Sequence, residues 1–325
     1  MDSRPSLSRR EAIGVFAATS VLLGMGYGIH AFSGTLAAAR RRVSAGSAVI
    51  PTRLGALEFS IAGRGRPLMM IHGTGGGFDQ GLSFASGLIA RGHRIVAPSR
   101  FGYLRSDFPA DASSANQADG LVELLDRLGI ERLPVAGGSA GALSAVQLAL
   151  RHPDRCSGLI LLVPAANVSG RDPVEMTAFQ EFMVEGVLNS DFLYWAALNT
   201  MPDRLVGTLL ATDPALLAQA SAEERRRAYR ILEEILPISG RVRGMRNDAQ
   251  LAGNPAQVEF DGIRVPTLVI SVEDDRFGTA ATAREIARAV PGAELIVYPS
   301  GGHIWLGHDG DVADEITRFI ETLPR

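Results

Sequence analysis

The sequence contains no lysine, and all 32 of its basic residues are arginines. This absence excludes catalysis through a lysine Schiff base, phosphate binding by a P-loop lysine, and a serine–lysine dyad, because each of these needs a lysine amine.

Cysteine is almost absent as well. The single cysteine, Cys156, lies in an apolar run, so the chain can form no internal disulfide and has no Cys-x-x-Cys metal or redox motif. The formal net charge is −3, and outside the amino-terminal region only residues 223–230 are dense in arginine. Nucleic acid is therefore not an expected partner.

The first 42 residues differ in composition from the rest of the chain. A Ser-Arg-Arg tripeptide at residues 8–10 precedes residues 12–32, which are uncharged apart from a possible charge on His30. This start resembles a twin-arginine export signal peptide, with possible cleavage sites at residues 31–33 and 37–39. The same run is also long enough to cross a bilayer core of about 30 Å, so an uncleaved transmembrane helix is the competing interpretation. Both interpretations predict a protein of the cell envelope, exported or associated with the membrane, in preference to a cytoplasmic one.

From residue 43 onward, short apolar runs alternate with helical patterns. Residues 68–71, 133–138 and 156–164 are almost continuously apolar, which is typical of strands covered on both faces in a parallel sheet. Two alternating runs within residues 49–62 predict an antiparallel hairpin before them. The sequence therefore predicts an α/β fold with a mostly parallel, doubly wound sheet.

This alternation stops at residue 165 and resumes at residue 263. The intervening pattern is helical and rich in Met, Phe and Leu, which predicts a helical insertion. An insertion between two strands of such a sheet must lie over the carboxyl ends of the strands, where α/β proteins bind ligands. We therefore predict an amino-terminal segment at residues 1–42, a core at residues 43–164 and 263–325, and a helical cap at residues 165–262.

A Gly-Gly-Ser-Ala-Gly turn at residues 137–141 joins an apolar strand to a helix. In this G-x-S-x-G pattern the serine occupies a sharp turn, and the glycines let both directions of the chain pass close by. Ser139 Oγ is then exposed above the sheet, and the N-terminus of the helix directs unpaired N–H groups toward the same place. The pattern alone is equally compatible with a simple turn, so its context decides its meaning.

Further polar groups follow later strands of the predicted sheet. Asp274 and Asp275 come after the strand expected at residues 265–272, and His303 comes after the last strand. The carboxyl ends of parallel strands meet at one edge of a sheet, so these side chains should meet Ser139 there. A serine hydroxyl needs an imidazole to take its proton, and the imidazole needs a carboxylate to fix its tautomer and stabilise its cation. The serine, the histidine and one of the two aspartates supply these three roles.

With two further loops, these motifs make the chain resemble the α/β-hydrolase family from about residue 49 to the C-terminus. His-Gly-Thr at residues 72–74, followed by three more glycines, is similar to the family's oxyanion loop, and residues 99–106 are similar to its D-R-P-G-F-G-R-S loop. The resemblance implies an oxyanion hole formed by the backbone N–H groups of Thr74 and Ala140. It also implies that the reaction needs no metal and no cofactor.

The resemblance also assigns the remaining acidic and histidine residues. The acid loop has lost the Gly and Pro of the family's G-x-x-D-x-x-x-P pattern, and the alignment favours Asp275 over Asp274 as the triad acid. His72 is expected to be a structural hydrogen-bonding residue of the oxyanion loop, and His308 a surface residue.

The expected function is that of a serine hydrolase. We expect it to cleave a carboxylic ester of a small to medium apolar substrate through an acyl-enzyme on Ser139, since the insertion is rich in apolar side chains. A carbon–carbon bond hydrolase or a lactonase with the same triad is one alternative, and a non-catalytic, envelope-anchored ligand-binding protein is another. Dehalogenases and epoxide hydrolases are disfavoured, because the family uses aspartate in place of the serine in those branches.

Overall fold

Within the residues that the computed structural model describes, 9–166, 186–253 and 257–324, the central element is an eight-stranded sheet. Its strand order is β1-β2-β4-β3-β5-β6-β7-β8. The pairs β1–β2 and β2–β4 are antiparallel and all others are parallel, so the predicted sheet and its hairpin are confirmed. The strands are β1 (Ala48–Thr52), β2 (Gly55–Gly63), β3 (Pro67–Ile71), β4 (Arg94–Pro98), β5 (Leu133–Gly138), β6 (Cys156–Leu162), β7 (Thr267–Val272) and β8 (Glu294–Tyr298).

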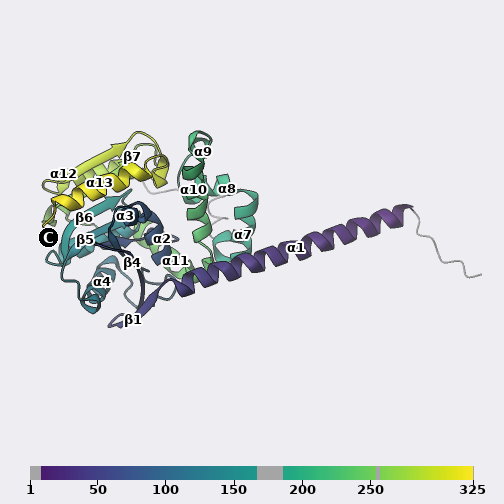
Figure 1. Cartoon of the computed structure of the whole chain (residues 1–325), viewed down its shortest axis with the longest axis horizontal. Coiled ribbons are helices and arrows are strands. Elements are labelled where there is room, and N and C mark those ends of the chain that lie inside the picture. Colours follow the sequence, from purple (N-terminus) through teal and green to yellow (C-terminus); the bar gives the residue numbers. More distant parts are fainter. Residues whose placement is uncertain (1–8, 167–185, 254–256, 325) are drawn as a thin grey trace, which may run out of the picture.

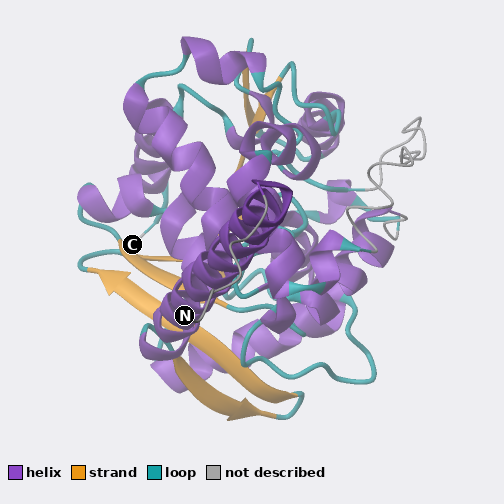
Figure 2. Cartoon of the chain, turned by 90° about the vertical axis from the view of Figure 1, so that its right-hand side faces the viewer, coloured by secondary structure: helices purple, strands orange, loops and turns teal. Residues whose placement is uncertain are grey.

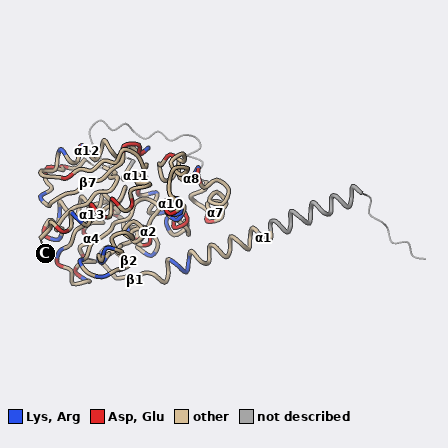
Figure 3. Tube along the Cα trace, turned by 45° about the horizontal axis from the view of Figure 1, so that its top comes forward, with Lys and Arg blue, Asp and Glu red and all other residues tan. Residues whose placement is uncertain are grey.

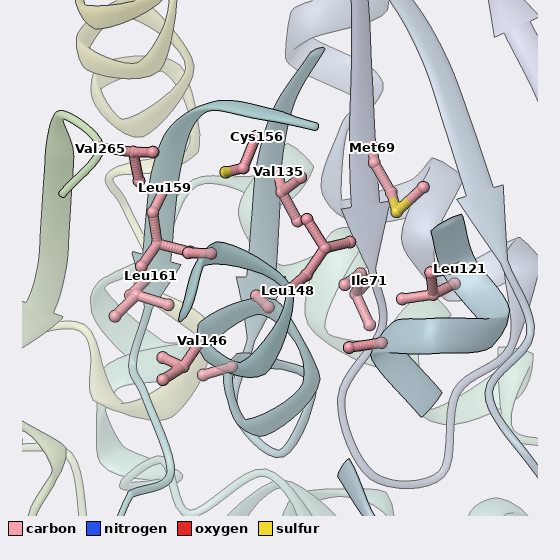
Figure 4. Packing of buried hydrophobic residues seen from close by; sticks show 14 of the residues in the cluster. Met69, Ile71, Leu121, Val135, Val146, Leu148, Cys156, Leu159, Leu161 and Val265 are labelled. Carbon is pink, nitrogen blue, oxygen red and sulfur yellow. The ribbon is translucent and has the colours of Figure 1, made fainter. Parts of the chain in front are cut away.

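Helices cover both faces of this sheet (Figures 1 and 2). Successive residues of a strand point to opposite faces, so Met69 and Ile71 enter one apolar cluster while Leu68 and Met70 enter another. The first cluster, part of which Figure 4 shows, also contains side chains of α4, α5 and α12. The second cluster contains side chains of α2, α3 and α13. Two covered faces explain why the strands are continuously apolar. These helices are α2 (Phe78–Phe84), α3 (Ser86–Ala90), α4 (Ser114–Leu128), α5 (Gly141–Arg151), α12 (Thr279–Ala289) and α13 (Asp309–Thr322).

A helical cap is inserted between β6 and β7, as predicted. Its helices have an apolar cluster of their own, in which Leu205, Ile231 and Leu232 are buried. Residues 167–185 of the predicted cap lie outside the described residues. The described helices of the cap are α7 (Asp191–Thr200), α8 (Pro202–Leu209), α9 (Ala215–Gln219), α10 (Ala222–Glu234) and α11 (Val242–Gly253), with short 3-10 turns η1 (Val187–Asn189), η2 (Ile238–Gly240) and η3 (Phe260–Gly262).

The amino-terminal helix α1 (Arg9–Ala45) is 37 residues long and projects away from the rest of the chain (Figure 1). Its inner end packs on the cap, where the Phe32 ring lies 5.2 Å from that of Phe192 and 5.7 Å from that of Trp195, and Ala39 is buried. No helix within the described residues has both the length and the apolarity to cross a membrane. The side chains of residues 9–25 and 27 are outside the description, so the signal-peptide and transmembrane interpretations both stay predictions.

Candidate active site

The predicted nucleophile occupies a strained turn between β5 and α5. Ser139 has a φ of +50°, a left-handed conformation that costs a non-glycine residue about 1–3 kcal/mol. A Cβ added at Gly137 would lie 2.6 Å from the carbonyl oxygen of Gly141, and one added at Gly141 would lie 2.5 Å from that of Ile71. Neither position has room for a side chain, which explains the glycines of the sequence motif.

The structure brings Ser139, His303 and Asp275 together, although the serine and histidine are 164 residues apart. His303 Nε2 lies 2.9 Å from Ser139 Oγ, and His303 Nδ1 lies 2.8 Å from an Asp275 oxygen. The histidine is in a 3-10 turn, η4 (Gly302–Ile304), that follows β8, and its ring and that of Phe277 are nearly perpendicular, with their centroids 4.9 Å apart. These distances are those required for an imidazole to accept the serine proton while a carboxylate orients the ring.

Asp275 is a buried carboxylate that accepts several hydrogen bonds. It accepts hydrogen bonds from the Thr279 hydroxyl and from the Phe277 N–H, the latter at 2.9 Å. Burial acts to raise the pKa of Asp275, but the charge and hydrogen bond of His303, with these two donors, outweigh it and hold the pKa below its ordinary value. Asp274 is placed differently, because it accepts a hydrogen bond from the Gly302 N–H at 2.7 Å.

The predicted oxyanion donors belong to two segments that meet beside the serine. Residues 73–77, which we call the glycine loop, lie against the nucleophile turn, since a Cβ on Gly73 would be 3.2 Å from the Ser139 Cβ. Within the described part of the chain, the backbone N–H groups of Thr74 and Ala140 donate no hydrogen bond. Backbone N–H groups without internal partners beside a nucleophile are the kind of donor that an oxyanion hole requires.

The other candidate histidines have structural environments. His72 is fully buried, its Nε2 accepts the Arg100 N–H at 2.9 Å, and its Nδ1 therefore donates to the carbonyl oxygen of Gly73 at 2.7 Å. Burial and the charge of Arg100 hold the pKa of His72 well below its ordinary value, so this ring stays neutral. His308 stacks on Tyr298 and contacts Asp311.

A buried ion pair that the sequence analysis did not find joins the cap to the glycine loop. Arg100 and Asp248 of α11 form two hydrogen bonds of 2.6 Å, and Arg100 also donates to the carbonyl oxygens of His72 and Gly73 at 3.0 and 3.1 Å. Tyr103 donates its hydroxyl hydrogen to Asp248 and accepts a hydrogen bond from the loop at Gly75. The two charges are 148 residues apart in sequence, and no local pattern marks them as partners.

A metal site or a cavity elsewhere in the chain could also bind a ligand. In the described part of the chain, no group of three or more His, Cys, Asp or Glu side chains has the arrangement of a metal site. A cavity of about 530 Å³ lies between α1 and the cap, where its walls include Ala39, Arg42, Trp195 and Tyr229. None of the residues lining this cavity is Ser139, Asp275 or His303.

Comparison with known sequences identifies hydrolases. A family profile described as alpha/beta hydrolase fold matches residues 66–307. A 2-hydroxymuconate semialdehyde hydrolase of Pseudomonas putida is 28% identical over 270 residues, which are 80% of this chain and 88% of that protein. A 2-hydroxy-6-oxononadienedioate/2-hydroxy-6-oxononatrienedioate hydrolase of Paraburkholderia xenovorans is 28% identical over 261 residues, with 76% and 84% of the two chains covered.

Solved structures share the fold. An alpha/beta hydrolase fold protein from Nakamurella multipartita superposes with a TM-score of 0.67 at 26% identity, covering 84% of this chain and 98% of that one. A structure described as a membrane phospholipase A has a TM-score of 0.62 at 20% identity and covers 97% of this chain and 98% of its own. At that identity, the second likeness concerns the fold alone.

Proposed function

This chain belongs to the α/β-hydrolase family, and from that membership we propose that it is a serine hydrolase which cleaves a carboxylic ester through an acyl-enzyme on Ser139. The observation that carries the proposal is the 2.9 Å contact between His303 Nε2 and Ser139 Oγ, with Asp275 on the other side of the same ring.

The proposed reaction has two halves. Ser139 Oγ attacks the ester carbonyl while His303 takes its proton, and the N–H groups of Ala140 and Thr74 stabilise the oxyanion by about 3 kcal/mol each. His303 then gives the proton to the departing alcohol, which leaves an acyl-enzyme. A water molecule activated by His303 attacks the acyl group and regenerates the serine, while Asp275 stabilises each imidazolium that forms.

The two buried arginines beside the glycine loop offer no unpaired cation to a charged substrate. Two buried arginines contact the loop, and both are already held by carboxylates: Arg100 by Asp248 and Arg241 by Asp79. Neither guanidinium is free to bind a dicarboxylate of the kind named for the Paraburkholderia relative. We therefore place an apolar ester first among the substrates.

Carbon–carbon bond cleavage is the second candidate, and the names of the relatives favour it. The 2-hydroxymuconate semialdehyde hydrolase and the 2-hydroxy-6-oxononadienedioate hydrolase cover more than three quarters of this chain. Such a reaction would use the same three side chains, so the cap and not the triad would decide between the two candidates.

A fluorophosphonate probe tests whether Ser139 is the nucleophile. We expect the probe to label the native protein and not the Ser139→Ala variant, and ester turnover to fall about a millionfold in that variant, because the three side chains act as a unit. Folded native protein that takes up no label would instead support a non-catalytic ligand-binding protein.

A substrate series separates the two chemistries. We would measure kcat/KM for p-nitrophenyl esters of increasing acyl length beside lactones and a dienoic diketone. We expect the esters to have the highest values. A higher kcat/KM for the diketone would instead support carbon–carbon bond cleavage, and a higher value for lactones would support lactone hydrolysis.

We further propose that the amino-terminal segment anchors the protein to the membrane and is retained. Residues at both predicted cleavage sites belong to the inner end of α1, where Phe32 packs on two aromatic rings of the cap and Ala39 is buried. Removal of these residues would expose apolar surface of the cap to water, which is unfavourable.

A further inference from the structure

The inner end of α1 places one arginine between the cap and the core. Figure 3 shows basic residues where this helix meets the rest of the chain. Arg42, near the end of α1, forms an ion pair with Asp79 and donates to the carbonyl oxygens of Leu236 at 2.6 Å and Glu234 at 3.2 Å. Asp79 is in the first turn of α2, directly after the glycine loop, and Glu234 ends α10 of the cap. One guanidinium therefore joins three segments that are distant in the sequence.

Asp79 extends this contact to the glycine loop. Its second partner, Arg241, is fully buried and approaches the two carboxylate oxygens at 3.1 and 2.7 Å. The same guanidinium donates to the carbonyl oxygen of Gly76, inside the loop. Gly76 is two residues from Thr74, the proposed oxyanion donor. A continuous series of charged contacts thus runs from Arg42 to the loop that holds this N–H group.

A neighbouring side chain of α2 binds the backbone on the amino-terminal side of Thr74. Gln80 accepts a hydrogen bond from the Gly73 N–H at 3.0 Å. The backbone is therefore held before Thr74 by Gln80 and after Thr74 by Arg241, which contacts Asp79, so a shift of the first turn of α2 would be transmitted to both points. Arg42 and Arg241 are the two cations that hold this turn through Asp79.

The cluster needs both arginines. Burial acts to raise the pKa of Asp79, but Arg241 and Arg42 outweigh it and hold the pKa below its ordinary value, so the group is a carboxylate. Burial also raises the pKa of the nearby Glu234 carboxyl to about 7, and the charge of Asp79 adds to the rise. Without Arg42, Asp79 would retain one of its two arginine partners. The first turn of α2 would then be held through Asp79 by Arg241 alone, the guanidinium that also binds the Gly76 carbonyl oxygen.

We propose that Arg42 is a positioning residue for the glycine loop, so that the inner end of the amino-terminal helix is a functional part of the active site. The proposal rests on the proposed function, in which the Thr74 N–H stabilises the oxyanion. Arg42 does not touch the reacting atoms and acts through Asp79 and Arg241. Because the oxyanion exists only after attack on the carbonyl, loss of Arg42 should lower kcat and leave KM nearly unchanged.

The test compares Arg42→Ala with Arg41→Ala in the full-length protein. Arg41 is the adjacent residue, its side chain is exposed, and its substitution removes the same charge. We expect kcat for the best p-nitrophenyl ester to fall about 10- to 100-fold in Arg42→Ala, with KM within about twofold of native, because small displacements of a catalytic group have effects of this size. Arg41→Ala should have native kcat.

Arg42→Lys gives a graded control. A lysine keeps a cation beside Asp79 but lacks the planar fork that reaches two carbonyl oxygens, so kcat should be intermediate. If the alanine variant does not fold, the lysine variant carries the test alone. In that case native kcat in Arg42→Lys, with native hydrogen exchange of the glycine loop, would overturn the proposal.

Amide hydrogen exchange gives a readout that needs no substrate. Peptides that cover residues 73–77 should exchange faster in Arg42→Ala than in the native protein, and at the native rate in Arg41→Ala. A native protein inert toward esters and the fluorophosphonate probe would refute the proposed function, while the exchange rates would still test the positioning of the loop. Equal kcat in Arg42→Ala and Arg41→Ala, or unchanged exchange of the loop, would refute the role of Arg42.

Discussion

At the scale of single residues, two adjacent aspartates differ in what they contact. Asp275 faces His303 Nδ1 at 2.8 Å, whereas Asp274 binds the Gly302 N–H. We expect Asp275→Asn to lower kcat about ten-thousandfold, because an amide neither fixes the required tautomer nor stabilises the imidazolium. Steady-state kinetics on the best ester measures this loss.

Asp274→Asn is the matched comparison. The amide oxygen of the substituted side chain would still accept the Gly302 N–H, so we expect kcat to fall by less than about tenfold, in keeping with the modest net value of one neutral hydrogen bond. If the two asparagine variants lost activity equally, or if Asp274→Asn were the more damaging, Asp275 would not be the triad acid.

At the scale of elements, the nucleophile turn depends on the close approach of α5 to β3. A Cβ at Gly141 would lie 2.5 Å from the carbonyl oxygens of both Ile71 and His72. Gly141→Ala should therefore push the start of α5 away from the sheet, lower the free energy of unfolding by about 1–3 kcal/mol, and displace Ser139. Urea unfolding measures the first effect, and the rate of fluorophosphonate labelling measures the second.

Gly310→Ala is the control for that substitution. Gly310 is in the first turn of α13, and a Cβ there would meet no atom within 4 Å. Alanine is the better helix former by about 0.5–1 kcal/mol, so this variant should be as stable as the native protein or more so. A Gly141→Ala variant with native stability and a native labelling rate would show that the turn tolerates a side chain.

The same elements show what the sequence could and could not predict. Continuous apolar runs indicated the central strands, since β5 and β7 are buried along their whole length, and the order of Ser139, Asp275 and His303 after β5, β7 and β8 located the candidate site. The pairs Arg100–Asp248 and Arg42–Asp79 had no such signal. Their partners are brought together by the packing of the cap and of α1 on the core, which local patterns do not encode.

At the scale of the whole molecule, the amino-terminal helix packs on the cap by its inner end. The Phe32 ring contacts two aromatic rings, each contact contributing about 0.5–1.5 kcal/mol beyond apolar burial, and Ala39 is buried. We expect these residues to be present in the mature protein, so the intact mass of protein from the membrane fraction should correspond to a chain that retains residues 31–39. As a control on the packing itself, Phe32→Ala should lower the free energy of unfolding, whereas substitution of the exposed Ser33 should not. A mature chain that begins at residue 34 or 40 and is recovered in the soluble envelope fraction would refute retention and favour an exported enzyme.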